Sequence, residues 1–504
     1  MGFQGLPTFA TGCHGMTGGR GCELFAPQAG RYYTAMNPPP SSPSTASAAA
    51  PVSQVMAGDP ATTSTGIRAA VFAQAQGTLS CRDLLEQARA AHERHRDLNA
   101  IAWIDFDAAA RDADSLDQRR RAGAPLRPLH GVPVTIKDLF NVTGMPTAAG
   151  TRARLPDFGG ESLAVSRLRA AGALVFAKTN MHEIALGATG ENIWTGDVLN
   201  PHDPARQAGG SSSGAGVAVA VGIGLAGVGS DTGGSVRIPA AFSGVVGFKP
   251  TFGAIPLAGA LHLSWTCDHA GPLTRSVDDA AAMFEAMSGR RTAHARVARR
   301  PRLAVPVRWL AGRLHPAMRA WFESRLADWR RQADITEVMT PVMMDASAQY
   351  TVVARAEAAH VHRKVLASGG EGFSPGVLAP MRLGEQIALR TYLEALQYRE
   401  ALRAELDALL RDHDALVLPS SAVPPPLRGQ TEVEVESGIV TVREAVLGQT
   451  LPFSFAGFPA ISLPGGSVES LPASIQLVGA RERDAALLGL ARWIEGQSGA
   501  EAGF

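Results

Sequence analysis

Residues 209–240 read GGSSSGAGVAVAVGIGLAGVGSDTGGSVRIPA. Two serines in this stretch, Ser211 and Ser235, each follow a Gly-Gly pair, and a run rich in Ala, Val and Gly separates them. Glycine enters backbone conformations that are closed to other residues and leaves the backbone N–H groups uncovered. Because the run carries hydroxyl groups but no charge before Asp231, it indicates a water-poor site that could hold an oxyanion.

The best candidate for the base that such a site needs is Lys137. It ends an apolar, β-branched run in residues 131–138, GVPVTIKD, which is too short for a helix and is typical of a buried strand. Lysine acts as a base only when it is neutral, so its pKa must fall by several units from about 10.4. Burial among the apolar neighbours would lower it, whereas Asp138 would oppose the shift if its carboxylate faced the amine.

These two segments resemble the amidase signature family of serine hydrolases. The family's long glycine/serine signature matches residues 209–240, and its lysine segment corresponds to residues 131–138. The likeness extends from residue 67 to residue 495, and a match of this length is far more specific than a short motif. The resemblance implies our predicted fold class, a single large α/β/α domain with a central mixed, twisted sheet covered by helices.

The resemblance also implies how the reacting groups are assembled. Ser235 would be the nucleophile, Ser211 would relay its proton, and Lys137 would accept it. In the family the peptide bond before the relay serine is cis, which here makes Gly210 a supporting residue. We interpret Asp231 and Arg237, which flank the nucleophile, as a structural ion pair. The predicted oxyanion-hole donors are the backbone N–H groups of Thr232, Gly233, Gly234 and Ser235.

The sequence also predicts residues of the substrate pocket. Three of them, one in a loop and two in the segment KTNMHE, are predicted to line the substrate pocket: Thr147, Met181 and Glu183. Three histidines could also face the pocket, although lone histidines are more often core or surface residues: His182, His262 and His269.

Two short motifs within residues 209–240 suggest other chemistry. Residues 210–214 fit GxSxG, which would make Ser212 an α/β-hydrolase nucleophile, but residues 204–208 do not have the pattern of the strand that must precede it. Residues 222–227 fit GxGxxG, but the glycines that follow leave no place for a helix to start, which disfavours a dinucleotide site.

Composition excludes several classes of function. The chain has 504 residues, of which 45% are hydrophobic and 18% charged, as in a globular protein that buries a substantial core. The formal net charge is +1 and basic runs with interleaved aromatics are absent, so we expect no nucleic-acid partner. Without a long glycine-free apolar run, we also expect no membrane association.

The four cysteines are scattered, without a CxxC pair: Cys13, Cys22, Cys81 and Cys267. This usage fits a reducing cytosol, so we expect a cytoplasmic protein without a disulfide framework. Cys13 and His14 with Cys22 could suggest zinc, but no second pair completes four ligands. We expect no metal and no cofactor.

Residues 1–65 differ in composition from the rest of the chain. They include PPPSSPSTASAAAP at residues 38–51, so we predict a disordered N-terminal extension, and their start does not resemble a signal peptide. Residues 66–498 are predicted to form the amidase signature domain. Within this domain residues 290–440 are predicted to be variable and to determine specificity, and residues 499–504 are predicted to be a tail.

Helices alternate with short apolar runs in the domain, which indicates an α/β fold. Predicted helices begin near residue 78 and cover residues 108–121, 162–171, 277–287 and 393–410. Predicted strands cover residues 130–138, 173–177, 415–419, 453–464 and 473–479.

The function that these patterns predict is hydrolysis of the C–N bond of small amides, with anilides and carbamates (urethanes) as candidate substrates, by a monomer or homodimer. One alternative is the glutaminase subunit of a tRNA-dependent amidotransferase, which needs partner subunits. His269 follows Asp268 where we expect glutamine in those subunits, and residues 350–380 lack their glutamine-binding arginine pattern. A second alternative is a non-catalytic scaffold, which the three intact catalytic positions disfavour.

Overall fold

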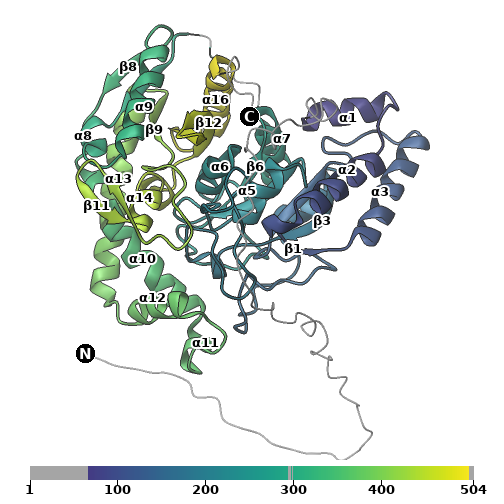
Figure 1. Ribbon diagram of the computed structural model, residues 1–504, viewed down its shortest axis with the longest axis horizontal. Helices are drawn as coiled ribbons and strands as arrows, with labels where there is room; N and C mark the ends of the chain where they lie inside the picture. The colour runs from purple at the N-terminus through teal and green to yellow at the C-terminus, as the bar shows by residue number, and fades with distance from the viewer. Residues whose placement is uncertain (1–65, 293–296, 298, 499–504) are drawn as a thin grey trace, which may run out of the picture. The chain divides into compact units, whose positions relative to one another are not determined.

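An 11-stranded mixed sheet runs through the part of the chain that the computed structural model describes, namely residues 66–292, 297 and 299–498. The strand order is β1-β3-β2-β4-β6-β5-β12-β13-β9-β7-β8. In Figure 1 the label of β1 is on the right and that of β8, at the other edge of the sheet, on the upper left. The predicted extension, residues 1–65, and the predicted tail, residues 499–504, lie outside the described residues. The strands of this sheet are β1 (Ile101–Ile104), β2 (Pro133–Lys137), β3 (Leu174–Thr179), β4 (Ala226–Asp231), β5 (Val246–Lys249), β6 (His269–Thr274), β7 (Arg302–Val305), β8 (Asp334–Glu337), β9 (Ala415–Pro419), β12 (Ala460–Val468) and β13 (Leu471–Val478).

The sheet combines parallel and antiparallel pairing. β2 pairs in parallel with β3 on one side and β4 on the other, so it lies inside the sheet. From β4 through β6, β5, β12 and β13 to β9 the pairing is antiparallel, and β9, β7 and β8 are again parallel. All residues of β2 and β4 are buried, as expected for strands covered on both faces. The predicted α/β fold with a mixed sheet is confirmed.

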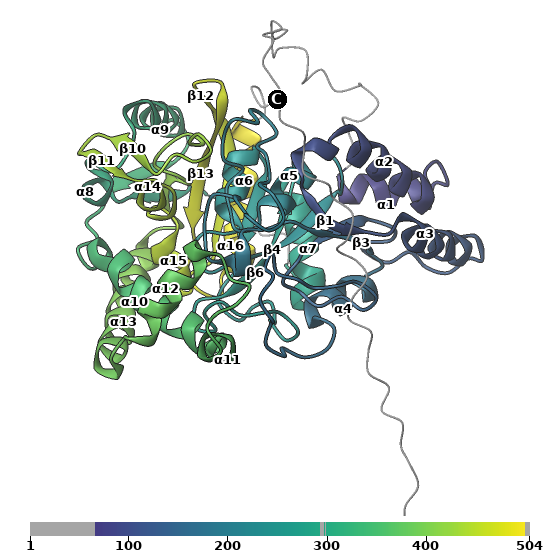
Figure 2. The ribbon, with the colours of Figure 1, turned by 60° about the horizontal axis from the view of Figure 1, so that its bottom comes forward.

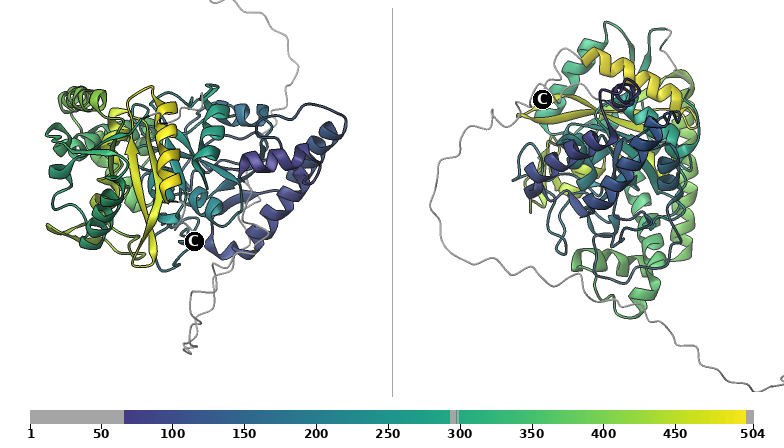
Figure 3. Two further views of the ribbon diagram at one scale, coloured as in Figure 1. Left: turned by 90° about the horizontal axis from the view of Figure 1, so that it is seen from above. Right: turned by 90° about the vertical axis from the view of Figure 1, so that its right-hand side faces the viewer.

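Helices cover both faces of the sheet. In β5, a Cβ added to Gly247 would lie 2.6 Å from the Cβ of Ala240 in α6 (Arg237–Ser243). The next residue, Phe248, packs edge-on against Phe284 of α7 (Val277–Ser288), with ring centroids 5.4 Å apart. Because successive strand residues point to opposite faces, α6 and α7 cover opposite faces. α16 (Asp484–Ser498) packs beside α7 and along β12 and β13 (Figure 3).

The other helices flank this centre. α12 (Pro375–Glu385) and α13 (Leu389–Asp412) both pack against α10 (Ala346–Val361), and α15 (Leu451–Ala456) contacts both α10 and α13 (Figure 2). A small separate sheet pairs β10 (Glu432–Val435) with β11 (Gly438–Thr441). The remaining α-helices are α1 (Ile67–Ala75), α2 (Cys81–Arg94), α3 (Phe106–Arg121), α4 (Leu163–Ala170), α5 (Ser213–Ala220), α8 (Val307–Leu310), α9 (Pro316–Trp329), α11 (Arg363–Ala367) and α14 (Val442–Leu447).

Most predicted elements are present, with shifts at their ends. β9 matches the predicted strand, and α2 begins after Ser80, whose hydroxyl accepts from the N–H of Asp83 in a capping box. Residues 453–464, however, do not form one strand. They divide into the end of α15 and the start of β12, because Gly457 at φ 79° ends the helix in a left-handed conformation. Residues 290–380 contribute β7 and β8 to the main sheet in addition to loops and helices.

Candidate active site

Lys137 ends β2 and is fully buried, with 0% of the residue exposed. The apolar residues that precede it in the strand are buried as well. Burial penalises the ammonium form and lowers the pKa of Lys137 to about 7, although the negative charges of Asp231 and Asp268 oppose this shift. The strand therefore holds an amine that can exchange a proton near neutral pH.

Three hydroxyl groups surround this amine. Its Nζ lies 2.7 Å from the Oγ of Ser211, 3.0 Å from that of Ser212 and 2.8 Å from that of Ser230. The contact with Ser211 was predicted, whereas those with Ser212 and Ser230 were not. Ser230 is a polar residue in a buried strand of small residues, and that signal could have indicated it.

A backbone hydrogen bond holds Ser235 next to the serine run that contacts Lys137. The N–H of Ser212 donates to the carbonyl of Ser235 at 3.2 Å, and Ser235 is 4% exposed. Among the described residues the Ser235 hydroxyl makes no side-chain hydrogen bond. The peptide bond between Gly210 and Ser211 is cis, as the resemblance implied. The structure thus joins Lys137 to Ser211 directly and brings the Ser235 backbone against the neighbouring residue of the serine run.

The loop of residues 232–235 leaves its backbone donors uncommitted. Within the described part of the chain none of its four N–H groups donates a hydrogen bond. The carbonyl of Gly233 accepts from the Thr450 hydroxyl at 2.7 Å. Gly234 has φ 148°, and a Cβ there would lie 2.2 Å from the Thr450 Oγ1. The loop therefore requires glycine, and its shape depends on Thr450, which no local sequence pattern indicates.

Asp231 and Arg237 form the predicted ion pair below this loop. Both residues are 0% exposed, and Arg237 donates from Nε at 3.0 Å and from Nη2 at 2.9 Å to the two carboxylate oxygens. The remaining donors of the guanidinium bind the Thr450 carbonyl, Gln476 and Ser454. Burial alone would raise the pKa of Asp231, but the Arg237 charge lowers it below its usual range. The pair remains ionised and anchors both ends of the loop.

Asp138 does not face Lys137. Its carboxylate pairs with the ammonium of Lys178 at 2.9 Å and accepts from the N–H of Ala148 at 3.1 Å. Asp138 lies in the turn that follows β2, where its carboxylate is held by Lys178 and the Ala148 N–H. The condition under which Asp138 would oppose the lowered pKa of Lys137 is therefore not met.

The three predicted pocket residues have different surroundings. Glu183 is 3% exposed, and its carboxylate accepts from the Thr151 hydroxyl, the Trp194 indole N–H and the N–H of Ser374. These contacts favour a structural role for Glu183. Met181 is buried in the apolar core, and the Thr147 hydroxyl accepts from Lys178 at 2.9 Å. Their part in the pocket stays a prediction.

A buried carboxylate that the sequence did not indicate also holds the loop. Asp268 accepts from the Thr232 hydroxyl at 2.6 Å and contacts the His262 Nδ1 at 2.9 Å. On the other side Tyr350 approaches the loop, since a Cβ on Gly233 would lie 2.8 Å from its hydroxyl oxygen. His269 is buried with its Nδ1 at the carbonyls of Asp231 and Cys267.

The competing motifs have no matching structure. Ser212, the GxSxG serine, follows isolated bridges and bends in place of a strand, and α5 begins after it. Residues 222–227 lead into β4 instead of a helix. Cys81 and Cys267 are free and buried, while Cys13, His14 and Cys22 lie outside the described residues.

The described residues contain neither a metal-ligating cluster nor a membrane-spanning helix. Their His, Cys, Asp and Glu side chains form no group of three or more that could hold a metal ion. None of the described helices has both the length and the apolar character needed to cross a membrane.

Comparison with known proteins gives a consistent family. A family model described as Amidase matches residues 82–488. AtzE of Pseudomonas sp. (strain ADP), which is a 1-carboxybiuret hydrolase subunit, is 34% identical over 423 residues, which cover 81% of this chain and 93% of that protein. The GatA-type subunit of the glutamyl-tRNA(Gln) amidotransferase of Symbiobacterium thermophilum is 33% identical, covering 78% of this chain and 88% of that protein.

A solved crystal structure agrees with these relatives. It is described as an amidase, is 48% identical in sequence and superposes with a TM-score of 0.84, covering 86% of this chain and 100% of the other. With a family model along most of its length and relatives of more than 30% identity, this protein belongs to the amidase signature family and is an amide-hydrolysing enzyme.

Proposed function

We propose that this amidase cleaves small amides through an acyl-enzyme, with Ser235 as nucleophile, Ser211 as proton relay and Lys137 as base. The observation that supports this most strongly is the 2.7 Å contact between the Lys137 Nζ and the Ser211 Oγ in a fully buried site. With its pKa lowered to about 7 by burial, the Lys137 amine is available as a base near neutral pH.

In the proposed reaction Ser235 Oγ attacks the substrate carbonyl while its proton passes to Ser211 and the Ser211 proton passes to Lys137. The tetrahedral intermediate collapses as the Lys137 ammonium returns a proton through Ser211 to the leaving nitrogen, and the amine departs. Water then attacks the Ser235 ester with the same relay, which releases the carboxylic acid and restores the free enzyme.

The uncommitted N–H groups of residues 232–235 support the proposed oxyanion hole. Each donor of this kind is worth roughly 3–4 kcal/mol in the transition state. Two buried supports, Thr450 at Gly233 and the Asp231–Arg237 pair, keep the loop in one shape before substrate arrives. A fixed array of donors needs no reorganisation during the reaction, which is why such rigidity favours catalysis.

For the substrate we propose small amides, including anilides and carbamates, which share an acyl C–N bond. The relative AtzE is a 1-carboxybiuret hydrolase subunit, and its substrate has such bonds. We also propose that residues 290–440 determine specificity, because Tyr350 from this region approaches Gly233. We also propose that the protein is cytoplasmic and that it is a monomer or a homodimer. Size-exclusion chromatography tests the oligomeric state.

Labelling by a fluorophosphonate, followed by peptide mass spectrometry, tests the nucleophile. We expect the adduct on Ser235, strong loss of labelling in S235A, and turnover within a panel of anilides, carbamates and esters. Because a non-catalytic scaffold would not be labelled, an unlabelled protein that turns over no member of the panel would support that alternative.

The glutaminase subunit is a second candidate, and the 33% identity to the amidotransferase relative favours it. Against it, the position where we expected glutamine is His269, which is buried and bound to backbone carbonyls. Ammonia release from free glutamine, measured together with the size of the purified protein, separates the two candidates. Glutamine turnover without anilide turnover would favour the glutaminase.

A further inference from the structure

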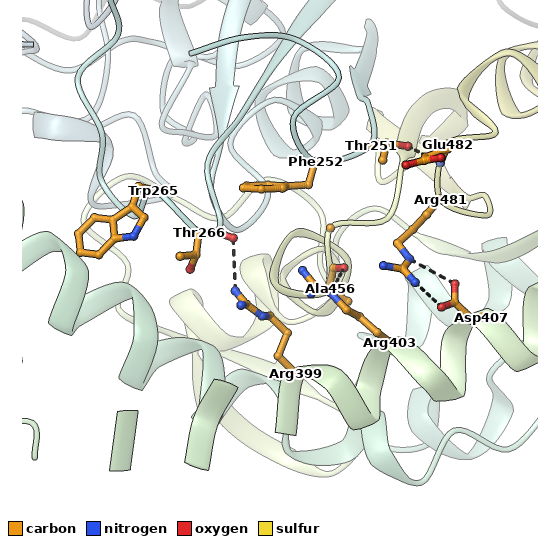
Figure 4. Close-up of a pocket in the computed structure, with 11 residues that line it drawn as sticks. Thr251, Phe252, Trp265, Thr266, Arg399, Arg403, Asp407, Ala456, Arg481 and Glu482 are labelled. Carbon is orange, nitrogen blue, oxygen red and sulfur yellow. Dashed lines mark hydrogen bonds and ion pairs between the residues drawn. The ribbon is translucent and has the colours of Figure 1, made fainter. Parts of the chain in front are cut away.

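A cavity of about 800 Å³ opens beside α13, and no proposed catalytic side chain lines it (Figure 4). Arg399 and Arg403 extend into it from α13, and Arg481 enters from the loop after β13. Two aromatic residues, Phe252 and Trp265, line the opposite wall. Like charges repel each other at short range, so an anion in this cavity would reduce the repulsion among the three guanidinium groups.

Arg399 is the least satisfied of the three. Its side chain is 12% exposed, and its Nε is buried without a hydrogen-bond partner among the described residues. Its Nη1 makes a long contact of 3.5 Å with the Thr266 carbonyl, and the Glu400 carboxylate lies 3.8 Å from the Nε. The guanidinium also lies over the Phe455 ring, 5.8 Å from its centroid. A buried donor without an acceptor is costly, so an anion that accepted hydrogen bonds from this guanidinium would be favoured.

Arg403 lies one helical turn further along α13. It donates to the Ala456 carbonyl at 2.9 Å and to Glu400 at 2.7 Å, so one carboxylate, itself 61% exposed, serves both arginines. Burial, followed by the nearby charge of Arg399, lowers the pKa of Arg403. The Arg399–Arg403 end of the cavity therefore has more positive charge than Glu400 can balance.

The acidic groups that line the cavity lie beyond Arg403, on the side away from Arg399 (Figure 4). Asp407 holds Arg481 with contacts of 2.5 Å and 3.3 Å, and Glu482 lies next to Arg481 in the chain (Figure 4). The local charge therefore differs along the cavity, with the excess positive charge on the side of Arg399. An anion would be attracted by Arg399 and Arg403 and weakly repelled by Asp407.

The aromatic wall provides an apolar surface across from the arginines. Phe252 and Trp265 are 40% and 39% exposed, and each also makes an edge contact with a histidine ring, His269 and His360 respectively. The N–H of Phe252 donates to the Gly457 carbonyl at 3.1 Å, which holds this wall close to the end of α15. A flat ring could pack against these aromatic faces.

We propose that this cavity binds a small organic anion, a carboxylate or phosphate attached to a planar ring. The anionic group would lie between Arg399 and Arg403, whose planar guanidinium groups match two oxygens at once. The ring would lie against Phe252 and Trp265. This inference concerns a second site and does not depend on the proposed amide hydrolysis.

The test is calorimetric titration of the full-length protein with benzoate and with phenyl phosphate. Benzyl alcohol has the ring without the charge, and acetate has the charge without the ring. We expect at least one ring-bearing anion to bind with a Kd of about 1 mM or tighter, and both controls to bind about tenfold more weakly. The tighter of benzoate and phenyl phosphate identifies the anionic group.

Variants locate the binding. R399Q should raise the Kd for the anion by about tenfold. R390Q, on the exposed start of the same helix, should leave the Kd unchanged. D407N removes a repelling carboxylate and should tighten binding, which keeps the test decisive if R399Q does not fold. Unchanged affinity in folded R399Q, weaker binding in D407N, or no binding of either ring-bearing anion would each overturn the proposal.

Discussion

The hydroxyl of Thr450 donates a 2.7 Å hydrogen bond to the carbonyl of Gly233, although the two residues are 217 positions apart in the chain. Thr450 comes directly before α15, and its own carbonyl accepts from Arg237. One residue thus links the loop of the proposed oxyanion hole to the ion pair below it. The proposed catalytic geometry depends on this C-terminal segment as much as on the glycine/serine stretch itself.

Removing the Thr450 hydroxyl should therefore impair catalysis. In T450V the side-chain shape is kept, but the Gly233 carbonyl loses its partner, which costs about 1–3 kcal/mol. We expect kcat to fall by about tenfold or more with a smaller change in KM, because the loop acts mainly in the transition state. T450S, which keeps the hydroxyl, should remain near wild type. Equal kcat in T450V and T450S would contradict this role.

A side chain at position 234 should disable the loop. In G234A the new Cβ would meet the Thr450 Oγ1 at 2.2 Å and the Ile238 Cδ1 at 2.6 Å, so the backbone would have to move. We expect kcat/KM to fall by about 100-fold, comparable to the loss of an oxyanion donor. The matched control is G429A, at φ 73° with nothing within 4 Å of its Cβ. If both variants keep full activity, the loop does not have the proposed function.

The buried ion pair should matter for stability far more than an exposed one. R237M leaves Asp231 buried without its partner, which should lower the free energy of unfolding by about 3–5 kcal/mol. The matched change R428M breaks the partly exposed pair with Asp197 and should cost about 0–1 kcal/mol. Urea unfolding followed by circular dichroism measures both. Similar losses in the two variants would show that burial does not set the difference.

Much of this arrangement is predictable from the sequence because it is local. Lys137 at the end of a short apolar run and the paired glycines before each serine indicate a buried base and an exposed backbone. The contacts that complete the site join distant segments, such as Thr450 with Gly233 and Asp268 with Thr232. No periodicity connects such residues, since only the folded sheet brings them together. The division of residues 453–464 into a helix and a strand likewise depends on a single glycine.

Ser230 should tune the base without being part of the relay. Its Oγ lies 2.8 Å from the Lys137 Nζ and accepts a hydrogen bond from the ammonium form. A hydrogen bond to the charged form raises a pKa, so S230A should lower the pKa of Lys137 further. In profiles of kcat/KM against pH, the rising limb should move to lower pH. A shift to higher pH would mean that Ser230 favours the neutral amine instead.

The most direct test of the proposed chemistry is the pH dependence of kcat/KM for a simple anilide, measured below and above the pKa of about 7 that burial gives Lys137. The neutral amine is the active form, so the rate should rise with pH and level off above that value. In K137A, kcat/KM should fall by about 1,000-fold or more and should no longer rise with pH across this range. A K137A enzyme with near-normal rates, or a wild-type rate that does not change across this range, would contradict the proposal that a buried neutral lysine activates Ser235 through Ser211.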